Sequence, residues 1–419
     1  MIPSLNVKRN GRSRLVVARG FIGHGVVAAL VGLAGSAQAE VDVWWDLSAG
    51  AEAVAYPQIK GLPDESQPPG WALDQTLSGR LNLAWYPTTS LEVGVHYGLA
   101  EQARLAQADG DDALQRALES DPANFRWRDL DATLVDDDPV RIRQNLDRAY
   151  VRAYPGLGDI TLGRQPISFG LARVYSPVDV ILPTGLLAQE PDYRAGVDAV
   201  RWLVPLGAVS ELDLGWVFGD DSVVFARGYT QAGRFTWEAT ALTVNQEHQV
   251  LGLGTQTSMG DWGLWQEMAL LATEQEPDGG TGFRATLGVD QQILGDVYVV
   301  AEYHFNSLGV DGDYAEISNS GWHQTGLVSP WGRHYLSLQA SKPLSPLWQA
   351  SLGQAVNLSD GGLLFTGAFS RSMGNNSTLD LTFMHALAER PEVIDDEPRI
   401  LDEYGVYPSR IQVNWSTVF

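Results

Sequence analysis

The chain has 419 residues, a formal net charge of -23 at pH 7 and no cysteine. The acidic balance argues against a nucleic-acid partner, because binding phosphate groups requires a positively charged surface. The lack of cysteine excludes a disulfide framework and a thiolate metal site, so burial and hydrogen bonding must stabilise the fold.

The first 39 residues have the pattern of a secretory signal peptide. Basic residues from Lys8 to Arg19 precede a short apolar stretch from Gly25 to Ala34, and Ala37-Gln38-Ala39 matches a cleavage site. The apolar stretch is shorter than the ~20 residues of a membrane-spanning helix. We expect residues 1–39 to be removed on export, leaving residues 40–419 as one domain.

Apolar and polar residues alternate throughout the mature chain, and this period of two predicts β-strands with two different faces. In the stretch TLSGRLNLAWYP, Leu81 and its alternate neighbours are apolar, whereas Arg80 and Asn82 are polar. We expect the apolar face to meet lipid and the polar face to line a lumen. The residues assigned to the lipid face include Leu81, Val95, Val299 and Leu381, and those assigned to the lumen are Arg80, His96, Glu302 and Asp380.

The breaks between strands alternate between short turns, such as PTTS at Pro87, and longer loops, such as residues 101–139 and 166–195. Such alternation is typical of bacterial outer-membrane barrels. It predicts an all-β protein, a transmembrane antiparallel β-barrel of about 18 strands with short periplasmic turns and long extracellular loops; 16 strands also fit. A soluble β-sandwich or propeller would also alternate, but would not need an apolar face on nearly every strand.

One long loop is unusually apolar. The stretch GRQPISFGLARVYSPVDVILP, residues 163–183, begins as a strand and then carries Val178, Val180 and Ile181 between prolines. Prolines argue against a helix or an inner strand here, and an exposed loop of this character is a liability. We expect residues 166–195 to fold into the barrel and form a constriction loop, with Val178 to Leu182 packed on the inner wall.

The stretches AYVRAYPGLGDITLGRQPISFG, YSPVDV and GVDAVRWLVP together resemble a region shared by several Gram-negative outer-membrane channels, including porin-like families and alginate-exporter-type barrels. The resemblance covers roughly residues 145–205. It implies that Arg164 and Gln165 lie at the wall near a constriction and that Asp198 and Arg201 belong to the returning strand.

Charged residues cluster around the expected constriction, and the strand register slips near Leu146. We expect Arg164, Arg173 and Arg201 near the narrowest point, facing acids such as Asp179 and Asp198. These arginines either pair with carboxylates and hold the loop, or attract anionic solutes, and both roles are compatible. The full set assigned to the constriction is Arg148, Arg152, Arg164, Gln165, Arg173, Asp179, Asp198 and Arg201.

The stretch RIQVNWSTVF closes the sequence with an amphipathic strand that includes Trp415 and ends in Phe419. A final strand of this kind resembles the assembly signal of bacterial outer-membrane barrels. It implies a location in the outer membrane and, as partners, the barrel assembly machinery, outer-membrane lipids and lipopolysaccharide. The sequence leaves open whether the barrel forms a homo-oligomer.

Enzymatic function finds little support, since neither H-x-x-x-H or H-E-x-x-H histidine spacing nor a G-x-S-x-G elbow occurs. We therefore expect no enzyme, no metal and no cofactor. The favoured function is a channel for passive diffusion of small polar or charged solutes. The alternatives are a dedicated exporter or importer of an anionic saccharide or organic acid, and a surface-structural or adhesive barrel.

Overall fold

The computed structural model describes residues 40–107, 122–181, 194–273, 280–314, 317, 320–395 and 397–419. The predicted signal peptide, residues 1–39, lies outside this part of the chain. The strands that form the main wall are β1 (Glu40–Ala55), β2 (Trp71–Thr88), β3 (Leu91–Gln107), β5 (Val140–Ala153), β6 (Asp159–Gln165), β7 (Val197–Pro205), β8 (Ser210–Val217), β9 (Val223–Ala232), β10 (Phe235–Val244), β11 (His248–Met259), β12 (Trp262–Thr273), β13 (Gly280–Ile293), β14 (Val297–Asn306), β15 (His334–Ser345), β16 (Trp348–Asn357), β17 (Leu363–Ser372), β18 (Ser377–Leu387) and β21 (Ser409–Val418).

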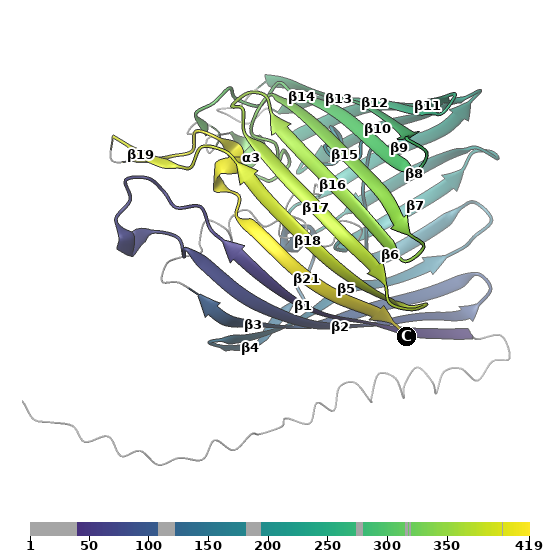
Figure 1. Cartoon of the computed structure of the whole chain (residues 1–419). Coiled ribbons are helices and arrows are strands. Elements are labelled where there is room, and N and C mark those ends of the chain that lie inside the picture. The colour runs from purple at the N-terminus through teal and green to yellow at the C-terminus, as the bar shows by residue number, and fades with distance from the viewer. Residues whose placement is uncertain are drawn as a thin grey trace, which may run out of the picture.

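These strands form a closed antiparallel ring, because β1 pairs with β2 on one side and with β21 on the other. The described residues form a 19-stranded sheet, and all of its strands except β4 (Ala132–Asp137) belong to the ring of 18. Closure leaves no open edge of backbone groups in the ring, as a membrane-spanning sheet requires. The predicted barrel of about 18 strands is therefore confirmed (Figure 1).

Short turns lie at one end of the barrel and long loops at the other, as Figure 1 shows. The C-terminus lies at the short-turn end, where Trp45 and Phe419 exchange two backbone hydrogen bonds of 3.1 and 2.9 Å. The elements of the long loops are short: η1 (Asp64–Ser66), η2 (Pro122–Phe125), α3 (Gly321–Gln324), β19 (Glu392–Ile394), β20 (Glu397–Arg399) and η4 (Glu403–Val406). Within the described residues, no helix is long and apolar enough to span a membrane, a finding that does not concern β-barrels.

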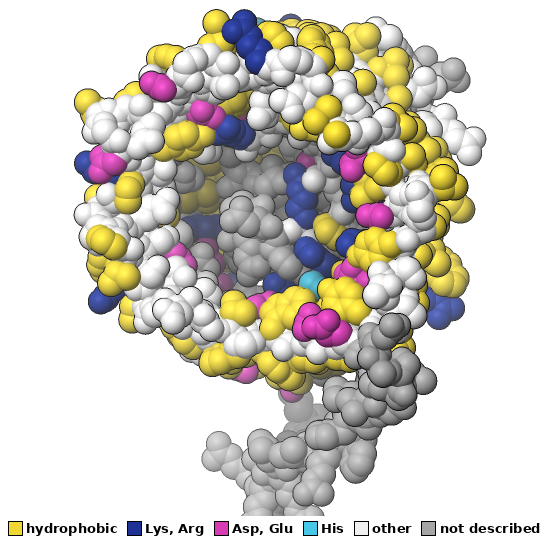
Figure 2. All heavy atoms as spheres, turned by 90° about the vertical axis from the view of Figure 1, so that its right-hand side faces the viewer, with side chains coloured by type: hydrophobic (Ala, Val, Ile, Leu, Met, Phe, Trp, Pro, Cys, Tyr) yellow, Lys and Arg dark blue, Asp and Glu magenta, His cyan; other side chains and the backbone are white. Residues whose placement is uncertain are grey.

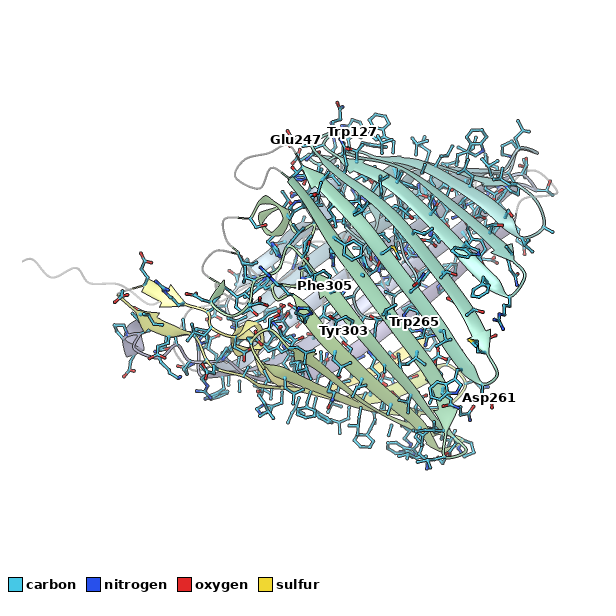
Figure 3. The ribbon with its side chains drawn as sticks, turned by 90° about the horizontal axis from the view of Figure 1, so that it is seen from above. Trp127, Glu247, Asp261, Trp265, Tyr303 and Phe305 are labelled. Atoms are coloured by element: carbon cyan, nitrogen blue, oxygen red, sulfur yellow. The ribbon has the colours of Figure 1, made fainter. Side chains whose placement is uncertain are left out.

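The two faces of the ring differ in chemistry. On the outer face, Trp45 of β1 lies opposite Leu81, which in turn lies opposite Tyr97 of β3. Trp45 and Tyr97 are exposed apolar side chains, as the lipid-facing side of a barrel requires. On β14 the outward residues include Tyr303 and Phe305, labelled in Figure 3, whereas Glu302, His304 and Asn306 between and beside them are buried inside.

The wall is uneven in height. β1, β2 and β3 contain 16, 18 and 17 residues, whereas β6 and β8 contain only 7 and 8. β6 pairs with residues 149–153 of β5, and β4 pairs with residues 140–144 of the same strand. Glu247 and Asp261, labelled in Figure 3, lie just beyond the two ends of β11.

Candidate functional site in the barrel lumen

Residues 166–181, which follow β6, lie inside the barrel; we call them the inward segment. Ile167, Phe169, Val178, Val180 and Ile181 are buried in one apolar cluster with inward-facing wall residues. The other members of this cluster include Val197, Ala199, Val217, Phe225, Leu271, Trp322, Leu327 and Val328. The segment therefore packs on the inner wall, as its apolar sequence predicts. The rest of the predicted loop, from residue 182 to residue 193, lies outside the described residues.

Glu302 of β14 holds the middle of the inward segment. Its carboxylate accepts backbone N–H bonds from Arg173, Val174 and Tyr175 at 2.9–3.0 Å. The Nε1–H of Trp265 donates a further bond of 3.0 Å to the same carboxylate. A buried carboxylate and an irregular backbone both need hydrogen-bond partners, and this arrangement satisfies both.

Two further glutamates bind the earlier part of the segment. Glu238 of β10 accepts a bond of 3.1 Å from the backbone of Gly170, and Glu267 of β12 accepts one of 3.2 Å from Ala172. With Glu302 they form a row of carboxylates on alternate strands, which we call the glutamate row. Sequence analysis assigned Glu302 to the lumen but overlooked Glu238 and Glu267, although alternation along their strands places both on the inner face.

Arg173 projects from the inward segment into the lumen. Its guanidinium lies 4.2 Å from the ring centroid of Trp265, forms an ion pair with Asp290 and donates to the hydroxyl of Tyr298. The arginine was expected to face Asp179 or Asp198, so its observed partner, Asp290 of β13, is new. The side chain keeps more than a third of its surface exposed, and it therefore remains accessible to a solute.

Arg201 of β7 and Arg227 of β9 share one carboxylate. Asp213 of β8, between them, accepts two bonds of 2.8 Å from Arg201 and one of 2.9 Å from Arg227. Asp213 is buried, whereas about a fifth of each arginine side chain is exposed. Two cations on one anion leave one net positive charge at this point of the inner wall.

Arg148 and Arg152 of β5 extend the basic surface toward the short-turn end. Arg152 lies 3.5 Å from a carboxylate oxygen of Glu92 and stacks 5.1 Å from the ring centroid of Tyr150. Arg148 lies opposite His96 across the β3–β5 pair. The register of this pair shifts between residues 96 and 97, next to Leu146, as the sequence indicates.

Arg164 and Asp198 form a tight pair, but on the outer face of the wall. They lie opposite each other in the ladder, on the same side as the exposed residues Leu162 and Val200. The predicted lumenal position of this pair is therefore wrong, because strand alternation turns both side chains away from the lumen. Nε and Nη2 of Arg164 donate to Asp198 at 2.9 and 3.1 Å. Nη2 also donates to the carbonyl of residue 128, and Nη1 donates to that of residue 146.

Residues 126–131 cover this pair from outside. The backbone N–H of Trp127 donates a bond of 3.0 Å to Asp198, and the side chain of Arg126 is fully buried beside Asp131 at 2.9 Å. Trp127 itself is 74% exposed at the rim, where Figure 3 labels it. The covering residues close the wall where β6 is short.

The remaining predicted residues occupy varied positions. Gln165 is buried and donates to the carbonyl of Ala199 at 3.2 Å. Asp179 pairs with Arg194 at 2.6 Å, and burial raises the pKa of this carboxyl to about 6 despite that cation. Arg80 of β2 lies opposite Asp46 of β1, and Asp380 accepts a hydrogen bond of 2.5 Å from the hydroxyl of Ser370. Near the C-terminus, Trp415 lies opposite Leu379 and Phe419 is exposed.

Another part of the inner wall carries few charges. A hollow of about 460 Å³ is lined by residues that include Gln339, Ser341, Ser351, Thr366 and Gln412. The charged pair at this hollow is Glu52 with Arg410, 3.7 Å apart. Figure 2 looks into the barrel from the short-turn end and shows an open interior whose wall carries acidic and basic side chains.

No protein-family model and no curated protein matches the chain. Several solved structures share its fold. Acinetobacter baumannii OccAB4 aligns with a TM-score of 0.54 and 7% identity over 92% of this chain and 100% of that one. Pseudomonas aeruginosa OccD3 (OpdP) aligns with a TM-score of 0.52 and 9% identity over 92% and 93%.

Pseudomonas aeruginosa OpdK, solved with vanillate, aligns with a TM-score of 0.50 and 11% identity over 90% of this chain and 98% of that one. At these identities the comparisons establish the barrel fold. The charges of the lumen must therefore carry any argument about function.

Proposed function

We propose that the chain is an outer-membrane channel for passive diffusion of small polar or charged solutes, narrowed by the inward segment. The observation that carries this proposal is a row of partly exposed arginines in the lumen, of which Arg201 and Arg227 share the single carboxylate of Asp213. These arginines are Arg148, Arg152, Arg173, Arg201 and Arg227. Charges at close quarters in a pore select among permeating ions, so this row favours small anions.

The location follows from the same proposal. The outer face is apolar, and the predicted signal peptide would deliver the chain across the inner membrane. We assign Trp415 and Phe419 to the assembly signal read by the barrel assembly machinery. Outer-membrane lipids and lipopolysaccharide would then surround the wall, and the stretch from Gly163 to the end of the inward segment would set the constriction.

Single-channel recording in planar bilayers tests the proposal. We expect discrete conductance steps and, under a salt gradient, a reversal potential that shows preference for anions. Deletion of Val174–Gln189 should raise the conductance, because it removes the middle and end of the inward segment. Absence of steps in a correctly folded barrel would instead favour a surface-structural role.

A dedicated transporter of an organic acid or anionic saccharide is the second candidate. Two features of the lumen favour it, namely the stacked Arg173–Trp265 pair and the adjoining hollow, since Tyr298 accepts a bond from Arg173 and also lines that hollow. The OpdK structure contains vanillate, an aromatic carboxylate, and vanillate is therefore a suitable probe. Block of the ion current by micromolar vanillate, but not by a neutral analogue, would favour dedicated transport over passive diffusion.

A further inference from the structure

The segment between β18 and β21, residues 388–408, extends from the outside of the barrel to its interior. Its outer part is the β19–β20 hairpin, which projects at the long-loop end in Figure 1. The backbone of Lys60 forms two hydrogen bonds with this part of the chain, each of 2.8 Å. Its N–H donates to the carbonyl of Pro391, and its carbonyl accepts from the N–H of Val393. Arg399 reaches Asp313 at 2.8 Å. These contacts attach the outer part to loop residues.

The inner part of the segment is η4, all four residues of which are buried. The hydroxyl of Tyr404 lies 3.2 Å from the hydroxyl of Tyr175, which belongs to the inward segment. The ring of Tyr404 also belongs to a buried cluster with Tyr335 of β15. One short turn thus connects an external hairpin to the segment that narrows the lumen.

The neighbour of Tyr404, Glu403, is a buried carboxyl. It accepts hydrogen bonds from the hydroxyl of Tyr335 and, at 3.0 Å, from the amide of Asn357. Its own backbone N–H donates to Asp360 at 3.0 Å. Among the described residues, no Lys or Arg forms an ion pair with Glu403. The titratable groups that face it are Tyr175, Tyr314, Tyr335, Asp360, Asp402, Tyr404 and Tyr407.

We propose that η4 is a proton-dependent latch: protonated Glu403 holds residues 388–408 against the inward segment, and loss of the proton releases them and widens the outer mouth. The latch regulates the proposed channel and so rests on that function. A buried carboxylate beside a second acid and with no cation paired to it is costly, and this cost outweighs the hydrogen bonds that Tyr335 and Asn357 donate to it.

The direction of the pH dependence follows from burial. Burial raises the pKa of Glu403 to about 8 although the hydrogen bond from Tyr335 opposes this rise, and the nearby Asp360 acts in the same direction as burial. A released Glu403 would titrate near 4.3. The latched arrangement therefore binds the proton more tightly. Its stability is complete below the lower pKa and falls as the pH rises toward 8, by at most about tenfold in the latched-to-released ratio per pH unit.

Asp402 adds a smaller contribution of the same sign. Burial, followed by the charge of Asp360, raises the pKa of the Asp402 carboxyl to about 6. Its carboxylate accepts backbone bonds from Glu389 and from Tyr404, at 3.2 and 2.9 Å. The structural role of these bonds makes Asp402 a poor site for a test, and Glu403 the better one.

The test compares the full-length mature barrel with Glu403→Gln between pH 6 and pH 9. Planar-bilayer conductance is the first readout. The second is tryptic cleavage after Arg399 in detergent, corrected at each pH for the rate of trypsin on a free arginine peptide. For the native protein we expect the conductance and the corrected rate of cleavage each to rise by severalfold toward pH 9. Glu403→Gln should abolish the rise and stay latched, whereas the exposed control Glu397→Gln should keep it.

A second variant, Tyr404→Phe, keeps the ring packing but removes the hydroxyl contact with Tyr175, and it should release the latch at a lower pH than in the native protein. A pH rise that persists in Glu403→Gln, or cleavage that is independent of pH in the native protein, overturns the latch. Absence of conductance at every pH overturns the proposed channel, and the cleavage readout then still decides the latch.

Discussion

Two arginine–aspartate groups lie within a few residues of each other on β6 to β9, and they differ in the face of the wall that they occupy. Arg164 and Asp198 point outward, and the guanidinium is only 3% exposed with its donors directed at protein oxygens. Arg201 and Arg227 point inward, share Asp213, and remain partly exposed. The same residue types thus seal the wall in one place and present charge to the lumen in the other.

The largest effect on stability should come from the outer pair. Arg164→Ala leaves the Asp198 carboxylate and two backbone carbonyls without their cation, and breaking a buried pair in this way costs about 3–5 kcal/mol. We expect the urea midpoint of unfolding in liposomes, followed by tryptophan fluorescence, to fall accordingly. Ion selectivity of the barrels that still fold should not change. A clear change of selectivity would place Arg164 in the lumen after all.

The next effect tests the faces of the wall far from these pairs. Leu381 of β18 lies opposite the exposed Val413, whereas its neighbour Asp380 is bonded to Ser370 inside. Leu381→Arg should cost about 2–4 kcal/mol near the bilayer midplane, and Asp380→Arg should cost much less. The fraction of heat-modifiable, folded barrel in the outer membrane measures both. Equal losses would show that the assignment of faces in β18 is incorrect.

A smaller stability effect is expected at the glutamate row. Glu302→Ala removes the acceptor of buried N–H donors, but a segment that detaches exposes them to water, so the net cost should stay near that of one uncompensated group, about 1–3 kcal/mol. The inward segment should then detach locally and the single-channel conductance should increase. Asp380→Ala is the matched control, since its carboxylate contacts a wall serine and no part of the inward segment. Unchanged conductance in Glu302→Ala would show that the segment does not limit flow.

Much of this architecture could be predicted from the sequence. Period-two alternation defines the faces of strands locally, and the apolar, proline-rich stretch after Gln165 predicts the inward path of the segment. The same alternation in DITLGRQ places Arg164 on the same outer face as Leu162. The prediction that Arg164 lies in the lumen was wrong because it followed the charge of the residue and not the strand alternation. The cover over Arg164 was not predictable, since Trp127 reaches Asp198 from 71 residues away.

The glutamate row and the latch show a second limit. An inward glutamate can be predicted from the strand that carries it, but its bonds to a loop 68 to 129 residues away depend on how that loop crosses the lumen. The contact between Tyr175 and Tyr404 joins residues 229 positions apart. Local patterns carry no information about such pairings, which arise only once the ring has closed.

The smallest free-energy effect is expected for the inner arginines, Arg201 and Arg227. It is also the most direct test of the difference between the inner and outer arginine–aspartate groups. Replacing Arg201 and Arg227 together by Gln removes two cations and leaves the buried Asp213, so the local charge changes from +1 to about -1. In water, a unit charge about 8 Å from a permeating ion is worth about 0.5 kcal/mol, or roughly twofold per charge. A change of two charges alters the permeability of the anion and that of the cation by roughly fourfold each, in opposite directions. The anion-to-cation permeability ratio, taken from reversal potentials in a KCl gradient, should therefore fall by roughly sixteenfold.

Arg164→Gln removes one cation from the outer face and serves as the matched control for this measurement. We expect it to leave the permeability ratio unchanged even where it lowers stability, because the bilayer side of the wall does not contact the permeating ions. The effect of the inner pair should also shrink as the salt concentration rises from 0.1 to 1 M, since the screening length falls from about 10 to 3 Å. A fall of equal size in both variants would mean that selectivity reports net charge alone, and the distinction between the two arginine groups would then be lost.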